Sequence, residues 1–202
     1  MKLNKKQISF GIIFLLHIIA FIVLFVFQLN DKYYGFESSI KINPFELEDH
    51  NGAKFTEKEL NSNFHFIYFG FLRCTEICPK GVSLLTRISK QIPDSDLRFV
   101  FVSIDPERDS KESINTYMQN RDKRFIGVRD SDINKIENFA GQFYVQFARD
   151  IFGKNNSAYQ INHSSNIILI NKSNNMIIRY PEGLEDISRI QSDFEYFKKN
   201  NN

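Results

Sequence analysis

The chain has two cysteines, and their spacing is the first feature that could support chemistry. Cys74 and Cys78 stand at positions i and i+4, directly before Pro79. In a helical segment this spacing places both sulfur atoms on one face, with Cα atoms about 6 Å apart, within the range of a disulfide. The same spacing allows two thiolates to bind one soft metal ion. The pair therefore predicts a redox site or a metal site.

A purely structural disulfide is the alternative for the same pair. A bridge that closes a loop of three intervening residues restricts the unfolded chain little, so it would stabilise the fold only weakly. Two cysteines are also too few for a disulfide-dense scaffold or a four-thiolate cluster. Common redox enzymes have two intervening residues rather than three, which disfavours an ordinary thioredoxin-type reductase. A functional site is therefore favoured over a structural bridge.

A third ligand would improve a copper site built from two thiolates, and the chain has four histidines. His17 lies within a long apolar segment, His50 in a polar stretch and His65 within a predicted strand. His163 directly precedes a predicted β-hairpin, which would pack beside the central strands and bring the preceding loop close to the cysteines. Topology alone leaves open whether His163 is a ligand or an ordinary loop histidine.

Neighbouring charges bear on the pKa of the two thiols. A helix N-terminus and the cations Arg73 and Lys80 should lower the pKa of Cys74 and Cys78, which would favour both metal binding and redox chemistry. The carboxylate of Glu76 acts in the opposite direction. The net expectation is a lowered thiol pKa.

The elements that would position these residues alternate between strands and helices. Apolar and β-branched or aromatic runs predict strands at 64–72, 97–104, 125–128, 166–170 and 176–180. Helical spacing of apolar residues predicts helices at 79–92, 109–118, 131–143 and 184–199. The order is typical of an α/β fold with a partly parallel, mixed sheet flanked by helices. The cysteines then lie at the carboxyl end of a sheet strand, where open α/β sheets place their sites.

An acidic block follows the second predicted strand. Asp109 and Glu112 have the spacing of a capping box, so Asp109 is predicted to cap a helix and Arg108 to lie in the preceding turn. Asp105 ends the strand and should lie at the same sheet edge as the cysteines. It could support a ligand or contact a partner, and the alternative is a simple Asp-Pro turn.

Residues 8–29 are apolar and contain no Lys, Arg, Asp or Glu. As a helix they would extend about 33 Å, enough to cross a hydrocarbon core of about 30 Å. Lys2, Lys5 and Lys6 precede them, so the positive-inside rule predicts a cytoplasmic N-terminus. The segment is longer than the apolar part of a signal peptide and lacks a small-residue cleavage site. We expect an uncleaved, single-pass anchor in a bacterial inner membrane, with the following domain in the periplasm.

This division predicts five parts: a cytoplasmic N-terminus at 1–7, a transmembrane signal anchor at 8–29, a linker at 30–43, one folded domain at 44–199 and a tail at 200–202. The formal net charge of +2 is unevenly divided among them. Without the three lysines of residues 1–29, the chain has 23 basic and 24 acidic residues, a net charge of −1. A nucleic-acid-binding domain would carry a basic excess, so that class is excluded.

Several segments together resemble the Sco/SenC family of membrane-anchored copper chaperones, and their order and separations also fit from about Phe45 to the final helix. The matching segments are Gly70-Phe71, Cys74-x-x-x-Cys78-Pro79, Val102-Ser103-Ile104-Asp105-Pro106-Glu107-Arg108-Asp109 and His163-Ser164-Ser165. The resemblance implies a thioredoxin-like fold in which Cys74, Cys78 and His163 bind copper, as Cu(I) or alternatively Cu(II).

The resemblance also implies a task. It implies a metallochaperone rather than an enzyme, which assists assembly of the binuclear copper centre in subunit II of cytochrome c oxidase. A copper donor protein and a thioredoxin-like reductant would be further partners. The alternative is a membrane-anchored thiol–disulfide oxidoreductase that reduces the cysteines of that subunit or of another extracytoplasmic partner, with Cys74 and Cys78 as its redox pair. A peroxide-reducing thiol enzyme and a non-catalytic docking module remain open.

Two positions depart from the family pattern. Thr75 stands where the family often has proline, and Asn162 stands where it commonly has aspartate. Neither change removes a ligand. The lost carboxylate beside His163 is expected to alter the basicity of the imidazole and the affinity for copper.

Overall fold

The computed structural model describes residues 5–28, 32–61, 63–74, 77–152 and 158–200, which belong to two compact units, Met1–Tyr33 and Tyr34–Asn202. In the first unit, helix α1 spans Lys5–Gln28. Within it the Nδ1 atom of His17 lies 2.8 Å from the carbonyl oxygen of Ile13, one helical turn earlier. Across the described residues, no helix combines the length and apolar character needed to cross a membrane. The transmembrane anchor therefore stays a prediction.

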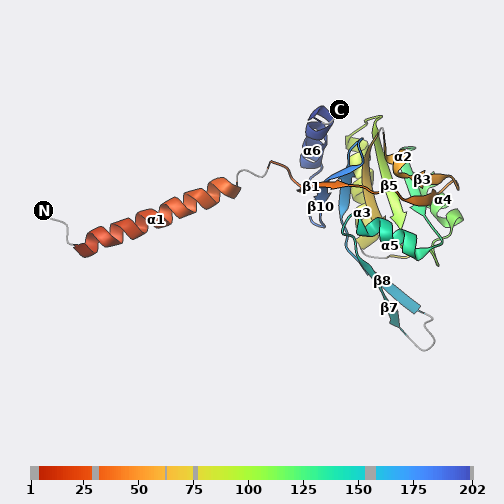
Figure 1. The fold of residues 1–202 in the computed structure, drawn as a ribbon, viewed down its shortest axis with the longest axis horizontal. Coiled ribbons are helices and arrows are strands. Elements are labelled where there is room, and N and C mark those ends of the chain that lie inside the picture. The colour runs from red at the N-terminus through yellow and green to blue at the C-terminus, as the bar shows by residue number, and fades with distance from the viewer. Residues whose placement is uncertain (1–4, 29–31, 62, 75–76, 153–157, 201–202) are drawn as a thin grey trace. The chain divides into compact units, whose positions relative to one another are not determined.

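The second unit is built on an eight-stranded mixed sheet in the order β1-β10-β9-β4-β5-β6-β2-β3 (Figure 1). Its strands are β1 (Phe36–Lys41), β2 (Glu46–Asp49), β3 (Lys54–Thr56), β4 (Phe64–Gly70), β5 (Leu97–Ser103), β6 (Phe125–Arg129), β9 (Ile167–Ile170) and β10 (Asn175–Tyr180). The central strands β4, β5 and β6 are parallel, whereas β9 pairs antiparallel with β4. The predicted mixed α/β sheet is confirmed.

Five helices of this unit are α2 (Glu57–Leu60), α3 (Ile77–Gln91), α4 (Lys111–Gln119), α5 (Ile133–Gly141) and α6 (Ile187–Asn200). Every residue of β4 is buried, as expected for a central strand covered on both faces. The ring of Tyr68 lies against Gly81 of α3, while the ring of Phe69 packs on Phe139 of α5 at 5.8 Å between centroids. Because neighbouring residues of a strand point to opposite faces, α3 and α5 cover opposite sides of the sheet.

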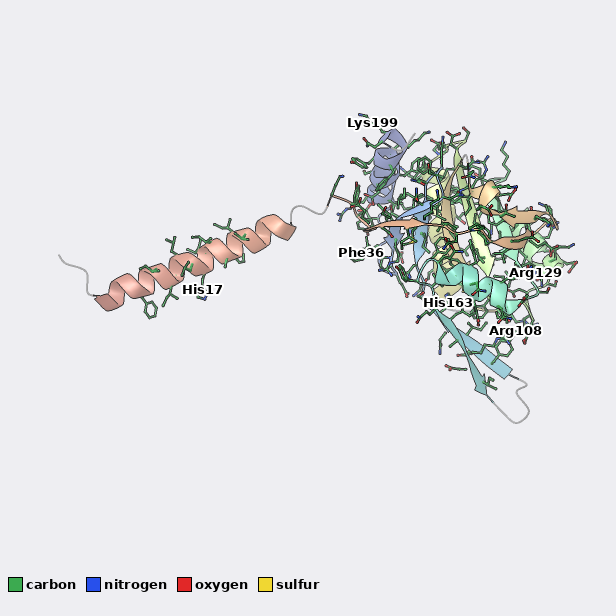
Figure 2. All side chains as sticks on the ribbon, viewed as in Figure 1. His17, Phe36, Arg108, Arg129, His163 and Lys199 are labelled. Carbon is green, nitrogen blue, oxygen red and sulfur yellow. The ribbon has the colours of Figure 1, made fainter. Side chains whose placement is uncertain are left out.

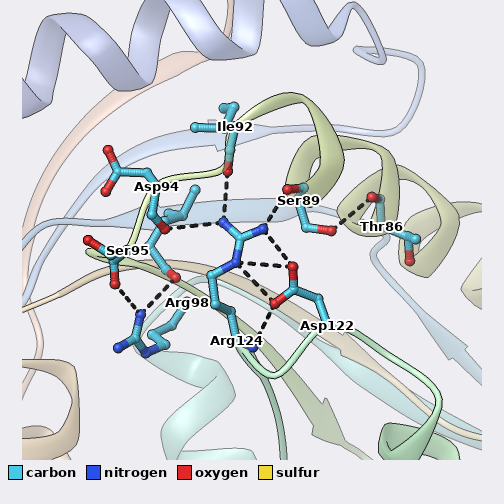
Figure 3. A network of polar contacts seen from close by, with 9 residues as sticks. Thr86, Ser89, Ile92, Asp94, Ser95, Arg98, Asp122 and Arg124 are labelled. Carbon is cyan, nitrogen blue, oxygen red and sulfur yellow. Dashed lines mark hydrogen bonds and ion pairs between the residues drawn. The ribbon is translucent and has the colours of Figure 1, made fainter.

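Arg124 attaches the carboxyl end of α3 to the start of β6 (Figure 3). Its guanidinium group donates to the carbonyl oxygens of Ser89 and Ile92, the latter at 2.7 Å, and pairs with the carboxylate of Asp122 at 2.8 Å. The last carbonyl groups of a helix lack partners within the helix. Arg124 supplies such partners from the turn directly before β6 and so fixes the end of the helix that carries Cys78.

Three segments differ from the sequence-based expectations. Residues 36–41, expected to be linker, form edge strand β1, and the backbone N–H groups of Tyr34 and Gly35 just before it donate to the carboxylate of Asp193. The short strands β2 and β3 were not expected. A separate two-stranded sheet, β7 (Phe147–Phe152) with β8 (Ala158–His163), forms from residues with no predicted structure. The expected strands and helices otherwise agree within a few residues.

Candidate metal centre

The cysteines lie where β4 gives way to α3. Cys74 precedes the helix and Cys78 lies in its first turn, so the backbone N–H of Cys78 donates to Cys74 Sγ at 3.2 Å. Neither cysteine is in a disulfide in the described part of the chain. Gly70 ends β4, and a Cβ atom there would lie 3.1 Å from Cys78 Sγ, tighter than ordinary packing. Glycine thus leaves room for the Cys78 sulfur at the carboxyl end of the strand.

His163 is the third member of the site. It is the last residue of β8 rather than part of a loop, and its Nε2 atom lies 3.3 Å from Cys78 Sγ. The ligand atoms of Cys74, Cys78 and His163 all lie within 4.8 Å of one another. Bonds of about 2.0–2.3 Å from a metal ion to nitrogen and sulfur separate its ligand atoms by at most about 4.6 Å. The three atoms can therefore hold one ion after shifts of a few tenths of an ångström.

The backbone orients the imidazole. Nδ1 of His163 lies 3.1 Å from the carbonyl oxygen of Ser164. Because a carbonyl oxygen only accepts hydrogen bonds, Nδ1 carries the proton, which leaves the Nε2 lone pair directed at Cys78. The backbone carbonyl of Ser164 thus orients the imidazole, which is the role expected of the carboxylate that Asn162 replaces. The Asn162 side chain itself donates to Asp150 on the exposed hairpin.

Burial dominates the proton affinities of the site. It raises the pKa of Cys78 to about 12, and the hydrogen bond with Cys74 acts in the same direction. It also lowers the pKa of His163, against the opposing effect of the Ser164 carbonyl. The expected lowering of the thiol pKa is wrong for Cys78, because removal from water outweighs the helix N-terminus and the surface cations. At neutral pH the pair is a protonated thiol facing a neutral imidazole. Glu76 and Thr75, which also entered the expectation, lie outside the described residues.

Aromatic rings enclose the imidazole. Tyr68 and Phe71 stand edge-on to it, with ring centroids 6.4 Å and 5.9 Å away. The Tyr68 hydroxyl forms a 3.2 Å hydrogen bond with the Ser165 hydroxyl, two residues after His163. A groove of about 730 Å³ is lined by His163, Ser164 and residues of α5 and β7. The imidazole is therefore packed against aromatic rings and also borders a groove.

Asp105 and Asp109 are both fully buried, but neither belongs to the three-residue cluster. Asp105 accepts hydrogen bonds from Arg108 and from the hydroxyl of Tyr159. Asp109 does not cap α4, which begins after Ser110, whose hydroxyl accepts from the N–H of Ser113. The capping prediction is therefore wrong: Asp109 instead accepts from the N–H of Leu72 at 3.0 Å and from the hydroxyl of Ser103 at 2.7 Å.

The remaining histidines of the domain serve the fold. His65 is fully buried within β4, and His50 accepts a hydrogen bond from the N–H of Gly127 at its Nδ1 atom. Within the described part of the chain, Cys74, Cys78 and His163 form the one group of three or more potential ligands. The hydrogen bond from Tyr159 to Asp105 was not predicted, because no motif or spacing in the sequence pointed to Tyr159.

The fold and this cluster define a thioredoxin-like protein with a soft-metal site. The SCO1/SenC family model matches residues 36–197, and the chain belongs to this family. A SCO2-like protein of Rickettsia prowazekii (strain Madrid E) is 35% identical over 141 residues, 68% of each chain.

Two solved structures share the fold. The copper-bound structure of Arabidopsis thaliana ScoI is 25% identical with a TM-score of 0.67, covering 80% of this chain and 99% of that one. Copper-bound yeast Sco1 is 26% identical with a TM-score of 0.64, covering 78% of this chain and 90% of that one.

Proposed function

We propose that the protein is a copper metallochaperone that binds copper through Cys74, Cys78 and His163. The observation that carries this proposal is the convergence of the three ligand atoms within 4.8 Å. Two thiolates and an imidazole form a soft donor set, which suits Cu(I). The copper-bound structures of relatives at 25% and 26% identity support copper as the ion.

The chain's own groups suit a cargo that is taken up and released. The neutral imidazole of His163 offers a lone pair without first losing a proton, whereas Cys78 must release its proton to become a ligand. The groove beside His163 gives an acceptor's thiols access to that side of the site. Transfer then proceeds by ligand exchange, in which each acceptor thiolate replaces one donor of the site.

A Cu(I) titration of the reduced full chain tests this proposal. His163→Ala should weaken binding by more than about a hundredfold, the upper end of what losing a supporting outer contact costs. His50→Ala is the matched control, because His50 lies outside the cluster, and it should leave the affinity unchanged. Equal affinity of His163→Ala and the unaltered chain would refute the three-ligand site.

We further propose that the acceptor is the binuclear copper centre in subunit II of cytochrome c oxidase, in line with the family. A copper donor protein would load the site and a thioredoxin-like reductant would keep its thiols reduced. Incubation of the copper-loaded chain with the apo copper domain of that subunit should move the metal to the acceptor, measured after separation of the two proteins. If this chain keeps its copper although the cysteines of the acceptor are reduced, the result would argue against this role.

We also propose that α1 anchors the chain in a bacterial inner membrane, with the domain in the periplasm. Its support is the uncharged apolar sequence of residues 8–29 and the three lysines before it. Carbonate-washed membranes should retain the full chain, and external protease should digest the domain in spheroplasts. Release by carbonate, or protection of the domain, would contradict the anchor or its orientation.

Reduction of a partner's disulfide is the second candidate function. The reduced state of both cysteines and the 3.2 Å hydrogen bond from Cys78 N to Cys74 Sγ favour it. The two thiols would form a disulfide while the partner's disulfide becomes two thiols, so two electrons and two protons pass to the partner. This reaction does not use His163, so a His163→Ala variant that still supports oxidase maturation would favour it over copper delivery.

A further inference from the structure

The loop of residues 105–109 contacts both the segment that carries the cysteines and the strand that carries His163. At its carboxyl end, Asp109 accepts from the backbone N–H of Leu72, two residues before Cys74. The same carboxylate accepts from Ser103 at the end of β5. The cysteine-bearing segment is thus fixed to the loop through a buried hydrogen bond.

The other end of the loop binds strand β8, which carries His163. The Tyr159 hydroxyl donates to the carboxylate of Asp105 at 2.6 Å, and the Arg108 side chain donates to the same carboxylate. The Arg108 guanidinium also lies 3.8 Å from the centre of the Tyr159 ring and donates to the Tyr159 carbonyl oxygen at 3.0 Å. Charge-assisted hydrogen bonds at a fully buried carboxylate are among the stronger polar contacts in proteins.

A second, outer pair extends the attachment to β7. Arg149 donates to the carboxylate of Glu107 at 2.6 Å, and its guanidinium lies 4.8 Å from the Tyr159 ring centre. The ring of Tyr159 therefore lies near two guanidinium groups, one from the loop and one from β7. Both strands of the hairpin are joined to the loop in this way.

Among the described residues, β7 and β8 pair with each other and not with the main sheet. The side chains named above attach the hairpin to the loop, and Figure 2 shows Arg108 and His163 at the end of the domain from which the hairpin extends. Tyr159 and His163 are four residues apart on β8, so they project from the same face of the strand. Restraining Tyr159 therefore restrains the strand that presents the imidazole to Cys78.

We propose that Asp105, Arg108 and Tyr159 are positioning residues. They hold the His163 imidazole where it can bind the same copper ion as the two thiols. The inference rests on the proposed function, since it assigns these residues an effect on copper affinity that passes through His163 alone. It also accounts for the acidic block that the sequence marked and that the three ligands leave unexplained.

A double-mutant cycle on the full chain tests the proposal. Tyr159→Phe removes the hydroxyl bonded to Asp105 and keeps the ring beside Arg108, so the fold should persist. It should weaken Cu(I) binding about tenfold, as expected for loss of a contact that orients a ligand. In a His163→Ala background the same change should have no further effect, because its route to the metal is gone. Tyr196→Phe on α6, at an exposed site, is the matched control and should leave the affinity unchanged.

X-ray absorption at copper supplies a readout that fold stability alone would not move. The nitrogen contribution present in the unaltered protein should weaken in Tyr159→Phe and in a second variant, Arg108→Lys, while both sulfur contributions persist. A tenfold loss that recurs in the His163→Ala background, or an unchanged nitrogen contribution, would overturn the positioning role. If His163→Ala alone binds copper like the unaltered chain, the proposed function itself fails, which is a different outcome.

Discussion

Raising the pH should tighten copper binding, because the Cys78 thiol must lose its proton before its sulfur becomes a ligand. Burial raises the pKa of Cys78 to about 12, so this thiol is protonated throughout the neutral range. Burial lowers the pKa of His163, which is therefore already neutral there and contributes no proton release. The direction of the effect is set by the thiol alone: fewer free protons favour the bound state.

The magnitude follows from one displaced proton. The apparent affinity should rise about tenfold for each pH unit, or about a hundredfold from pH 6 to pH 8, from Cys78 alone. A thiol with the ordinary pKa of 9.0 would stop contributing above that pH. The Cys78 contribution should instead continue to rise between about pH 9 and pH 11, and this range distinguishes the buried thiol from an exposed one.

Competition with a Cu(I) chelator whose own pH dependence is known would measure the slope, under anaerobic and reducing conditions. Alkylation followed by peptide mass spectrometry gives an independent check on the metal-free chain, in which the buried Cys78 should react more slowly than the half-buried Cys74. An affinity that is flat with pH, or that levels off near pH 9, would refute the assignment of Cys78 as a buried, protonated thiol.

Two further predictions concern the fold. A methyl group at Gly81 would lie 2.3 Å from a ring atom of buried Tyr68, so Gly81→Ala should lower the free energy of unfolding in urea by about 1–3 kcal/mol. Gly141→Ala, whose added Cβ meets nothing within 4 Å, should be neutral or slightly stabilising, and equal effects of the two changes would contradict this packing. Burial lowers the pKa of His65 to about 3 from 6.5, so the folded domain binds fewer protons than the unfolded chain between these values. Stability should therefore fall by up to about 1.4 kcal/mol per unit as the pH drops through that range, and a His65→Leu variant with the same slope in urea titrations would refute it.

The central strands and their helices could be predicted because their apolar residues follow the patterns of buried strands and helices. The run that became β4 is apolar and aromatic at nearly every position, and the strand is buried at every residue. The hairpin β7–β8 has no such pattern. Polar residues interrupt both of its strands, Arg149 and Asp150 in β7 and Gln160 and Asn162 in β8, so neither strand has the continuous apolar run that marks the central strands.

The sequence predicted that three particular side chains would lie together, but it did not predict their electrostatics. The ligand set followed from the family resemblance, and the structure brings Cys74, Cys78 and His163 together. The pKa of Cys78 depends on how completely the surrounding chain excludes water, a property of tertiary packing that local charges do not reveal. The same limit applies to Asp109, whose spacing from Glu112 imitates a cap while its true partners lie at Leu72 and Ser103.

The separation of Cys78 and His163 along the chain has a thermodynamic consequence for the cargo. The two ligands are 85 residues apart, so a bound ion closes a loop that includes β5, β6 and the hairpin. By the chain-entropy relation for cross-links, such a closure lowers the conformational entropy of the unfolded chain. This raises the free energy of the unfolded chain by about 4–5 kcal/mol at 25 °C. A bound copper ion thus acts as a reversible cross-link in the domain. Transfer of the ion to an acceptor removes the cross-link, and the unfolded chain regains its conformational entropy.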